Sequence, residues 1–319
     1  MSNFKGHIVK NSFLESEKFA EHYQWFKTAA DKFDAELEIL GNADILSGFE
    51  TENDKKLEEL IHNDDFIIFW DKDIRFGSKL EQICHQNNIL MCNSIESIAI
   101  CDDKAETYFK FWEYNQKAEA LNMKKISLIP TLVAPMTYPN IGYTDTSFLD
   151  NVIDTLGLPI VVKECSGSFG EQVYLAETKE ILNEIVQNLS GIPHIYQKFV
   201  KESCGRDVRL QVVGNRVVAA MYRYSVNGDF RANVTGGAHT KPYNPSDTEC
   251  ELAVKAVNTL GLDFGGVDML FSGKDSEADI LCEVNSNAHF KNMYICTGVD
   301  VADEIMKYII FAKNILKNC

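Results

Sequence analysis

Two short segments near the carboxyl end of the chain constrain its fold most: GGVDML at residues 265–270 and ADILCEVNS at residues 278–286. Each is typical of a β-strand, in which successive side chains point to opposite faces. Glu283 and Asn285 then share one face, and Asp268 joins them from a neighbouring strand. The sequence therefore predicts a strand pair with one polar face. The other face of the second strand is expected to carry Ile280, Cys282 and Val284.

The polar face has the composition of a magnesium site. Two carboxylates and an amide supply only oxygen ligands, which Mg²⁺ prefers, and Mg²⁺ usually keeps some positions for water and substrate phosphates. We predict a metal-nucleotide site at Asp268, Glu283 and Asn285. From these residues alone an ordinary exposed strand face stays open, because the pattern Glu-x-Asn is common.

Length and composition indicate a globular protein of two or three domains, with 319 residues of which 45% are hydrophobic. No run approaches twenty apolar residues, and the amino terminus lacks a basic region followed by an apolar run. We expect a cytoplasmic protein without a membrane partner. Nine scattered cysteines without a CxxC pair suit reduced thiols. The net charge of −16 opposes binding to nucleic acid.

The first part of the chain, up to residue 94, alternates short apolar runs with helical segments. This alternation predicts a parallel α/β sheet, whose ligands usually lie at the carboxyl ends of the strands. No GxGxxG follows the first strand, so the segment is expected to be a substrate-side or structural domain. The expected strands lie in HIV (7–9), AELEIL (35–40), DFIIFW (65–70) and NILMCN (88–93), and the expected helices at 16–33 and 78–85.

Two lysines and a glycine-rich loop follow. One helix is expected to run from Ile95 through residue 115 and to carry Lys104. A lone lysine on a helix usually has a solvated side chain, so this interpretation stays open for Lys104. A strand at 160–162 delivers Lys163 to a loop between two antiparallel strands, which excludes a Walker-type loop. Glycines there let backbone N–H groups approach phosphate oxygens, although a plain glycine-bearing hairpin stays open. The loop contains Ser166, Gly167, Ser168 and Gly170.

The segment GRDVRLQVVGNRVVAAMYR predicts a β-hairpin that turns at Gly214-Asn215. Its first strand should bury Val208, Leu210 and Val212 and present Asp207, Arg209 and Gln211 on the other face. Arg209 and Arg223 thereby become candidates for a polar cleft. A long polar loop containing Arg231 and Asn233 follows, and loops of this length are often functional. Helices are expected at 247–260 and 301–316.

Taken together, these segments resemble the ATP-grasp superfamily and most closely the RimK-type ligases, whose best-known member adds glutamate to a ribosomal protein's carboxyl terminus. The resemblance covers about residues 95–313 and is weak over 1–94. It implies an α/β fold with an N-terminal parallel α/β domain at 1–94, a small lid subdomain at 95–190 and a C-terminal subdomain at 191–319, with ATP between the last two. The matching stretches are VVKECSGSFGEQVYLAE, YQKFVKE, GRDVRLQVVGNRVVAA, GDFRAN, LGLDFGGVDML, CEVNS and TGVDVAD.

The resemblance also implies roles for single residues. Lys104 and Lys163 would contact the nucleotide phosphates under the loop at 166–170, and Asp207 would contribute to the nucleotide pocket. Arg209 would face the reacting phosphoryl or carboxyl group. Arg223, the other candidate for the polar cleft, is expected to be the second catalytic residue. Asp268, Glu283 and Asn285 would hold two Mg²⁺ or Mn²⁺ ions. The adenine hinge would be Gln197, Lys198, Phe199 and Val200, and Arg231 to Asn233 would approach the phosphates.

Three stretches depart from the family's pattern. The hinge reads Gln197-Lys198 where the family often has Gln-Glu. The family's Asn-x-x-Arg-Gly-Gly loop is shortened at residues 233–237 and loses its arginine. In the family, the motif Asn-Ser-Ser-Pro-Gly often follows the strand that carries the metal ligands. In this chain the corresponding residues, 285–289, are Asn-Ser-Asn-Ala-His. The last two changes fall where the acceptor should bind, so they put the substrate in question more than the use of ATP.

The implied reaction is ATP-dependent carboxylate–amine ligation through an acyl phosphate, with positioning and charge neutralisation as the protein's task. The main expectation is the addition of glutamate or another amino acid to a peptide or protein carboxyl group. The same mechanism on a small metabolite, or macrocyclisation of a ribosomal peptide, stays open. So does a non-catalytic ATP-binding module. The sequence does not decide whether the protein is a homo-oligomer.

Overall fold

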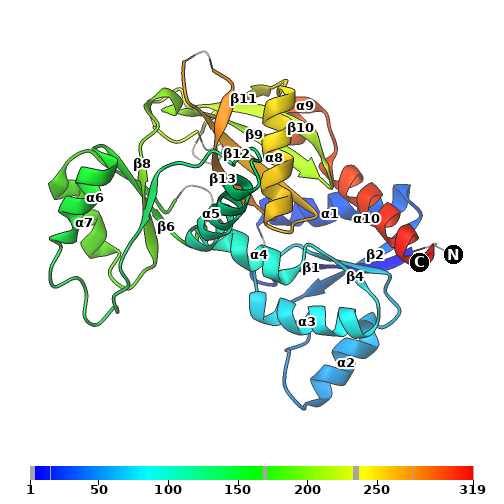
Figure 1. Cartoon of the computed structure of the whole chain (residues 1–319). Helices are drawn as coiled ribbons and strands as arrows, with labels where there is room; N and C mark the ends of the chain where they lie inside the picture. The colour runs from blue at the N-terminus through cyan, green and yellow to red at the C-terminus, as the bar shows by residue number, and fades with distance from the viewer. Residues whose placement is uncertain (1–3, 15, 168–170, 233–236, 275, 319) are drawn as a thin grey trace.

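The computed structural model describes residues 4–14, 16–167, 171–232, 237–274 and 276–318, and it contains three sheets (Figure 1). The first sheet has the order β2-β1-β3-β4 with all strands parallel, as predicted. Its side chains alternate: Ile8 and Ile68 face α1, whereas Val9 and Ile67 face α2 and α3. Helix α2 was not predicted from the sequence. The elements are β1 (Phe4–Lys10), α1 (Glu17–Lys32), β2 (Ala35–Gly41), α2 (Glu52–Ile61), β3 (Phe66–Phe69), α3 (Ile74–Gln86) and β4 (Leu90–Cys92).

The long helix predicted from Ile95 is wrong, because two helices, α4 (Ile95–Asp102) and α5 (Lys104–Ala120), meet at Asp103. Asp103 has an extended backbone, and its side chain accepts hydrogen bonds from the backbone N–H groups of Ala105 and Glu106. An aspartate in this position ends one helix and caps the next. Lys104 consequently begins α5, and its backbone N–H donates to the Cys165 carbonyl oxygen at 3.0 Å.

The second sheet is antiparallel, with the order β5-β8-β6-β7. Helices α6 and α7 pack against it around the fully buried Tyr196. The glycine-rich loop connects the antiparallel strands β6 and β7, as predicted. In Figure 1 this unit is green and stands apart on the left. Its elements are β5 (Thr131–Val133), α6 (Phe148–Leu156), β6 (Ile160–Glu164), β7 (Val173–Ala176), α7 (Lys179–Asn188) and β8 (His194–Lys198).

The third sheet is also antiparallel, with the order β11-β10-β9-β12-β13. The predicted hairpin is confirmed, with Gly214 at φ +56° in the turn between β9 and β10. Val208, Leu210 and Val212 are buried against α8, as predicted. The elements are the 3₁₀ turn η1 (Lys201–Ser203), β9 (Arg206–Val213), β10 (Arg216–Tyr224), β11 (His239–Pro242), α8 (Asp247–Thr259), β12 (Phe264–Phe271), β13 (Ala278–Asn285), α9 (Lys291–Thr297) and α10 (Val301–Asn318).

The expected side-chain alternation along β13 is wrong at Cys282. Asp268 pairs with Glu283, but the next residue of β12, Met269, pairs with Leu281, so Cys282 is an extra residue at a β-bulge. A bulge places two residues of one strand opposite one of the other and redirects a side chain. As a result Leu281 joins Val284 in the core, and Cys282 lines the same cavity as Glu283.

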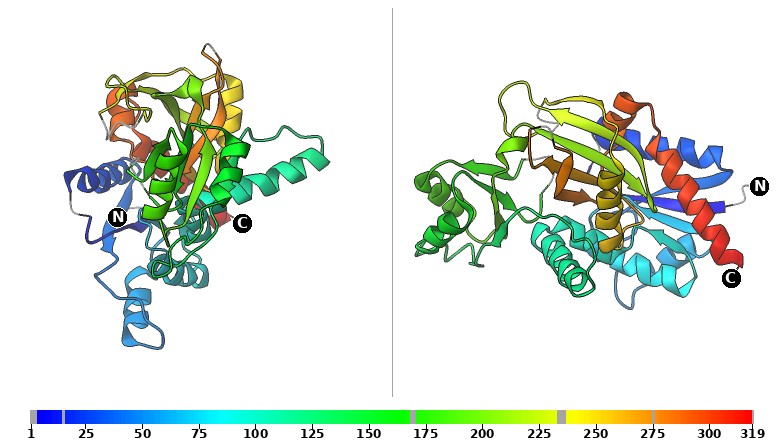
Figure 2. Two further views of the ribbon diagram at one scale, coloured as in Figure 1. Left: turned by 90° about the vertical axis from the view of Figure 1, so that its left-hand side faces the viewer. Right: turned by 45° about the horizontal axis from the view of Figure 1, so that its top comes forward.

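The first and third sheets share one hydrophobic core. Phe26 of α1, Phe66 of β3 and Phe264 of β12 belong to the same buried cluster as residues of α9 and α10. Figure 2 shows α10, the last helix of the chain, lying beside α1 of the first domain. The last helix thus packs against the first, and the shared core holds the third sheet against the first sheet.

The predicted domain limits at 94/95 and 190/191 stay predictions. Strand β8 pairs with β5 and β6, so we propose that the second unit extends to about Lys198. Within the part of the chain that the structure describes, no helix combines the length and apolar character needed to cross a lipid bilayer.

Candidate functional site

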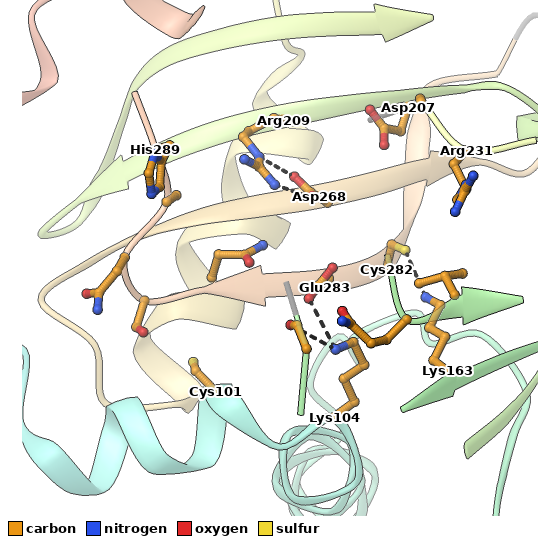
Figure 3. A pocket seen from close by; sticks show the side chains of 18 of the residues that line it. Cys101, Lys104, Lys163, Asp207, Arg209, Arg231, Asp268, Cys282, Glu283 and His289 are labelled. Carbon is orange, nitrogen blue, oxygen red and sulfur yellow. Dashed lines mark hydrogen bonds and ion pairs between the residues drawn. The ribbon is translucent and has the colours of Figure 1, made fainter. Parts of the chain in front are cut away.

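A cavity of about 850 Å³ lies where the three sheets meet, and Figure 3 shows it from close by. Side chains from β6 and the glycine-rich loop form one wall, and the polar faces of β9, β10, β12 and β13 form another. The carboxyl ends of β1 and β3 form its far end. The predicted site residues that line it are Lys104, Lys163, Gly167, Gln197, Lys198, Phe199, Val200, Asp207, Arg209, Arg223, Arg231, Asp268, Glu283 and Asn285.

The two predicted lysines both face β13. Lys104 Nζ lies 3.8 Å from Glu283 Oε1, and it lies 3.4 and 3.5 Å from the carbonyl oxygens of Cys165 and Gly167. Only 12% of its side chain is exposed, so the solvated alternative for this lysine is wrong. Lys163 is buried, and its Nζ lies 3.6 Å from Cys282 Sγ. Figure 3 shows both contacts as dashed lines. Two ammonium groups therefore stand opposite a strand that carries a carboxylate.

Arginines and aspartates form a network on three adjacent strands. Arg209 binds Asp268 with two hydrogen bonds of 2.6 Å. Arg223 binds Asp207 at 2.6 and 2.7 Å and also lies 2.9 Å from Asp268. Strand register explains the pairing, because Arg209 stands opposite Asp268 and Asp207 stands opposite Arg223. The pairs are bidentate, which fixes both the position and the orientation of each guanidinium.

Burial and the two arginines act in opposite directions on the aspartates. Burial disfavours the charge of Asp268, but Arg209 and Arg223 outweigh it and lower the pKa of Asp268 to about 2. For Asp207 burial is the larger effect and raises the pKa, against the attraction of Arg223. Asp268 is therefore the more firmly ionised of the two carboxylates.

The donor set at β12 and β13 fits Mg²⁺ in its chemistry. Asp268, Glu283 and Asn285 line one cavity and offer only carboxylate and amide groups. Asn285 Nδ2 is buried without a hydrogen-bond partner among the described residues, so these donors of the amide are not used by the described part of the fold, and Oδ1 is the atom that would bind a metal ion. Asp268 already accepts three hydrogen bonds, which leaves about one of its four lone-pair positions. Among the described residues, His, Cys, Asp and Glu side chains form no group of three that could hold a metal by themselves.

Only some of the predicted hinge and loop residues can be located at the cavity. Gln197 is buried, and its Nε2 donates to Thr131 Oγ1 at 3.0 Å, while the backbone N–H of Lys198 donates to the Pro130 carbonyl oxygen. Arg231 lines the cavity and pairs with Asp229 at 2.8 Å. Ser166 is exposed and is not among the lining residues. The predicted residues Ser168, Gly170 and Asn233 lie outside the described residues.

Sequence reasoning missed the end of the cavity that the first sheet builds. Trp70 and Asp71 directly follow β3 and line the cavity, as do Phe19 and Tyr23 of α1. Their position at the carboxyl end of a parallel strand was a usable signal, because ligands of such sheets usually lie there. Cys282 was missed because a β-bulge leaves no clear mark in a single sequence.

Comparison with known proteins agrees with this architecture. The family model described as RimK-like ATP-grasp domain matches residues 124–309. A "Probable alpha-L-glutamate ligase" of Cellvibrio japonicus (strain Ueda107) is 36% identical over 178 residues, which are 53% of this chain and 58% of that protein. An "Uncharacterized protein MG012 homolog" of Mycoplasma pneumoniae is 30% identical over 281 residues, 86% of this chain and 89% of that protein. The match spans a little over half the length of the first glutamate ligases compared.

Solved structures share the fold at low sequence identity. The ATP-grasp ligase PsnB, complexed with minimal precursor, Mg and ADP, superposes with a TM-score of 0.68 at 14% identity, over 98% of this chain and 99% of that one. The D-alanine–D-alanine ligase of Bacillus anthracis gives 0.67 at 15% identity, over 99% and 98%. Because the family model covers more than half of this sequence and the fold agrees, the chain belongs to the RimK-like ATP-grasp family.

Proposed function

We propose that this protein is an ATP-dependent carboxylate–amine ligase that forms an amide bond and releases ADP. One observation carries the proposal: Lys104 Nζ lies 3.8 Å from Glu283 Oε1, so an anion-binding lysine faces the acidic strand across the cavity. A nucleotide phosphate with a bound divalent cation suits such a pair, because the lysine meets the phosphate and the carboxylate meets the cation.

The proposed nucleotide site uses the residues that the family resemblance indicated. Lys104 and Lys163 neutralise phosphate oxygens. From the family resemblance we assign to the loop at 166–170 the exclusion of water from the acyl phosphate. Asp207 and Arg231 line the cavity and contribute to the pocket, and Asn233 is assigned to the phosphates from the resemblance alone. The adenine hinge is the segment from Gln197 to Val200, which continues from β8 along the cavity wall.

The proposed metal site consists of Asp268, Glu283 and Asn285, holding two Mg²⁺ or Mn²⁺ ions. Bound ions would neutralise the phosphate oxygens so that a carboxylate can approach them. Arg209 and Arg223 are the proposed catalytic residues, because their planar guanidiniums are held in fixed orientations beside Asp268. A guanidinium in this position stabilises the transferring phosphoryl group and the acyl phosphate.

The proposed substrates are an amino acid, glutamate foremost, and a peptide or protein carboxyl group. Relatives described as probable alpha-L-glutamate ligases support this choice. A ribosomally made peptide that is cyclised, or a small metabolite, is a second candidate acceptor. PsnB has been solved with a precursor peptide and matches nearly the whole of this chain in fold. The cavity of about 850 Å³ is large enough for a nucleotide and part of a second substrate.

ADP release in the presence of Mg²⁺, ATP, hydroxylamine and a panel of carboxylates tests the proposal. Hydroxylamine captures an acyl phosphate without needing the natural amine. A ligase should release ADP with at least one carboxylate and form the corresponding hydroxamate. ATP binding without ADP release across amino acids, peptides with free carboxyl ends and small acids would instead indicate a non-catalytic ATP-binding module.

A further inference from the structure

The end of the cavity built by the first sheet has its own chemistry, separate from the phosphate and metal groups. This end of the cavity is lined by the segment between β3 and α3, by α1 and by the segment after β13. The buried carboxylate of Asp71 lies there together with several aromatic side chains. The residues that line this end include Phe19, Tyr23, Trp70, Asp71, Arg75 and His289, together with Lys72 and Asp73.

Asp71 is a buried carboxylate, with an exposed fraction of 6%. It forms no ion pair with any described residue, and the lysine next to it, Lys72, pairs with Asp102. It accepts hydrogen bonds from Asn11 Nδ2 at 3.4 and 3.5 Å and from the backbone N–H groups of Lys72 and Asp73. Burial raises the pKa of Asp71, and the like charge of Asp73 adds to this effect. A buried carboxylate with neutral partners favours a ligand that brings a positive charge.

The loop that carries Asp71 is held on both sides by elements of the reaction site. Asn287 Nδ2 donates to the Asp71 carbonyl oxygen at 2.9 Å, and Asn287 follows the proposed metal ligand Asn285 by two residues. On the other side, Lys72 Nζ lies 2.5 Å from Asp102 Oδ1, at the end of α4 just before Lys104. The backbone that carries this carboxylate is thus held between the segment after β13 and the end of α4.

The wall around Asp71 suits an ammonium group. Trp70 and Tyr23 are 5% and 6% exposed, and the rings of Phe19 and His289 meet edge to face at 5.0 Å. Burial and the charge of Asp71 raise the pKa of Tyr23 to about 12, so this side chain stays neutral. Aromatic faces attract cations and keep water away from a reactive intermediate.

Arg75 offers a positive charge for a second, negatively charged group of the same ligand. It is an exposed residue on the first turn of α3, lines the same end of the cavity and forms no ion pair with any described residue. A ligand with an ammonium at Asp71 and a carboxylate at Arg75 is a zwitterion. Free amino acids have this arrangement of charges.

Resting on the ligase function proposed above, we propose that Asp71 binds the ammonium group of the amine substrate, an α-amino acid whose carboxylate meets Arg75. Asp71 accepts one ammonium proton, and the freed lone pair forms the C–N bond with the acyl carbon. The C–O bond of the acyl phosphate breaks as the C–N bond forms. Phosphate leaves with that electron pair and takes the second amine proton, so an amide and inorganic phosphate result.

Thermal melts test this assignment without requiring turnover. The full chain, loaded with Mg²⁺ and a non-hydrolysable ATP analogue, is melted with each of the twenty L-amino acids and then with the 2-hydroxy acid matching any amino acid that raises Tm. At least one amino acid should raise the Tm of the wild type, and its hydroxy analogue should not. Asp71→Asn should abolish the shift or require at least about tenfold more amino acid, because a charge-assisted hydrogen bond is lost.

Asp31→Asn is the control. Asp31 is an exposed carboxylate in the last turn of α1, the helix that carries Tyr23, and it does not line the cavity. This variant removes the same charge outside the cavity and should keep the shift. The proposal is overturned if Asp71→Asn keeps the shift, if the hydroxy acid works as well as the amino acid, or if no amino acid shifts the wild type. None of these outcomes touches the ligase proposal, which fails separately if hydroxylamine gives no ADP release.

Discussion

At the residue scale, the cavity is built from charged side chains that the fold has already paired with one another. Lys104 stands beside Glu283, and Asp268 is shared by two arginines. Burying an unpaired charge is costly, so at Glu283 and Asp268 the fold supplies partners that a ligand can replace. Removing one partner should therefore affect ligand binding more than folding wherever the side chain faces the cavity.

Lys163→Met tests the proposed phosphate contact. Lys163 is buried at the cavity wall, and methionine retains most of its volume while removing the charge. We expect the Kd for ATP to rise about 10- to 100-fold, because one charge-assisted hydrogen bond contributes about 1.5–3 kcal/mol. Calorimetric titration with Mg²⁺ and ATP measures this. Lys179→Met, on the exposed face of α7, is the control. Unchanged affinity in Lys163→Met would remove this lysine from the site.

Glu283→Gln tests the proposed metal site. Glutamine keeps the shape but removes a full negative charge from a strand that would bring cations to an anionic nucleotide. We expect ADP release to be lost and the Tm without ligand to stay near the wild-type value, because 31% of this side chain is exposed. Melts with and without Mg²⁺ and ATP, run beside ADP release, measure both effects. A variant that keeps the ligand-induced shift and turnover would contradict the assignment.

At the element scale, two local irregularities direct side chains into the cavity. The bulge in β13 turns Cys282 toward Lys163, and the break between α4 and α5 places Lys104 at a helix start. In both cases one residue departs from the regular repeat. Each departure moves a side chain from the position that a continuous strand or helix would give it.

Asp103→Ala tests the helix break. Its side chain accepts from the Ala105 and Glu106 N–H groups at 2.8 and 3.2 Å, and replacing an aspartate cap by alanine costs about 1 kcal/mol. We expect that loss in urea unfolding, together with weaker ATP binding because Lys104 loses its fixed backbone. Asp103→Asn should preserve both, since asparagine also caps. Equal stability and affinity in the alanine variant would show that the cap does not position Lys104.

At the scale of the whole molecule, Asn93 joins the first sheet to the third. It is fully buried, and its Nδ2 donates to the carbonyl oxygens of Phe264 and Ser286 at 3.0 and 3.2 Å. Its Oδ1 accepts from the backbone N–H groups of Asp263 and Phe264 at 2.7 and 3.1 Å. One side chain thus satisfies backbone groups at the start of β12 and just past the end of β13, which both contribute to the cavity.

Asn93→Ala should be among the most destabilising substitutions in the chain. It leaves buried backbone donors and acceptors without partners, which costs about 3 kcal/mol or more. Urea unfolding measures the loss. Asn258→Ala is the control, because Asn258 is exposed and its Nδ2 bonds only Asn215 among the described residues. A loss below about 1 kcal/mol for Asn93→Ala would mean that water or other groups replace its hydrogen bonds.

The sequence by itself determined many of the regular elements and the polar faces, although it did not reveal α2 or the break between α4 and α5. Alternation along β9 separated Val208 and Leu210 from Asp207 and Arg209, because side-chain direction follows from strand geometry alone. It also placed the glycine-rich loop between antiparallel strands and Asp268 beside Glu283. Residue roles and domain limits remain predictions.

Only the tertiary structure decided which segments meet. It brought Lys104 to Glu283 and Asp71 to Asn287, pairs that lie 179 and 216 residues apart, since such contacts depend on how sheets pack and not on local periodicity. It also set the bulge at Cys282, where pairing with β12 outweighed the regular repeat. The cap at Asp103 is local, but the backbone N–H of Lys104 just after it donates to the distant Cys165 carbonyl oxygen. Local pattern fixes the direction of a side chain within its element, whereas packing between elements fixes what that side chain faces.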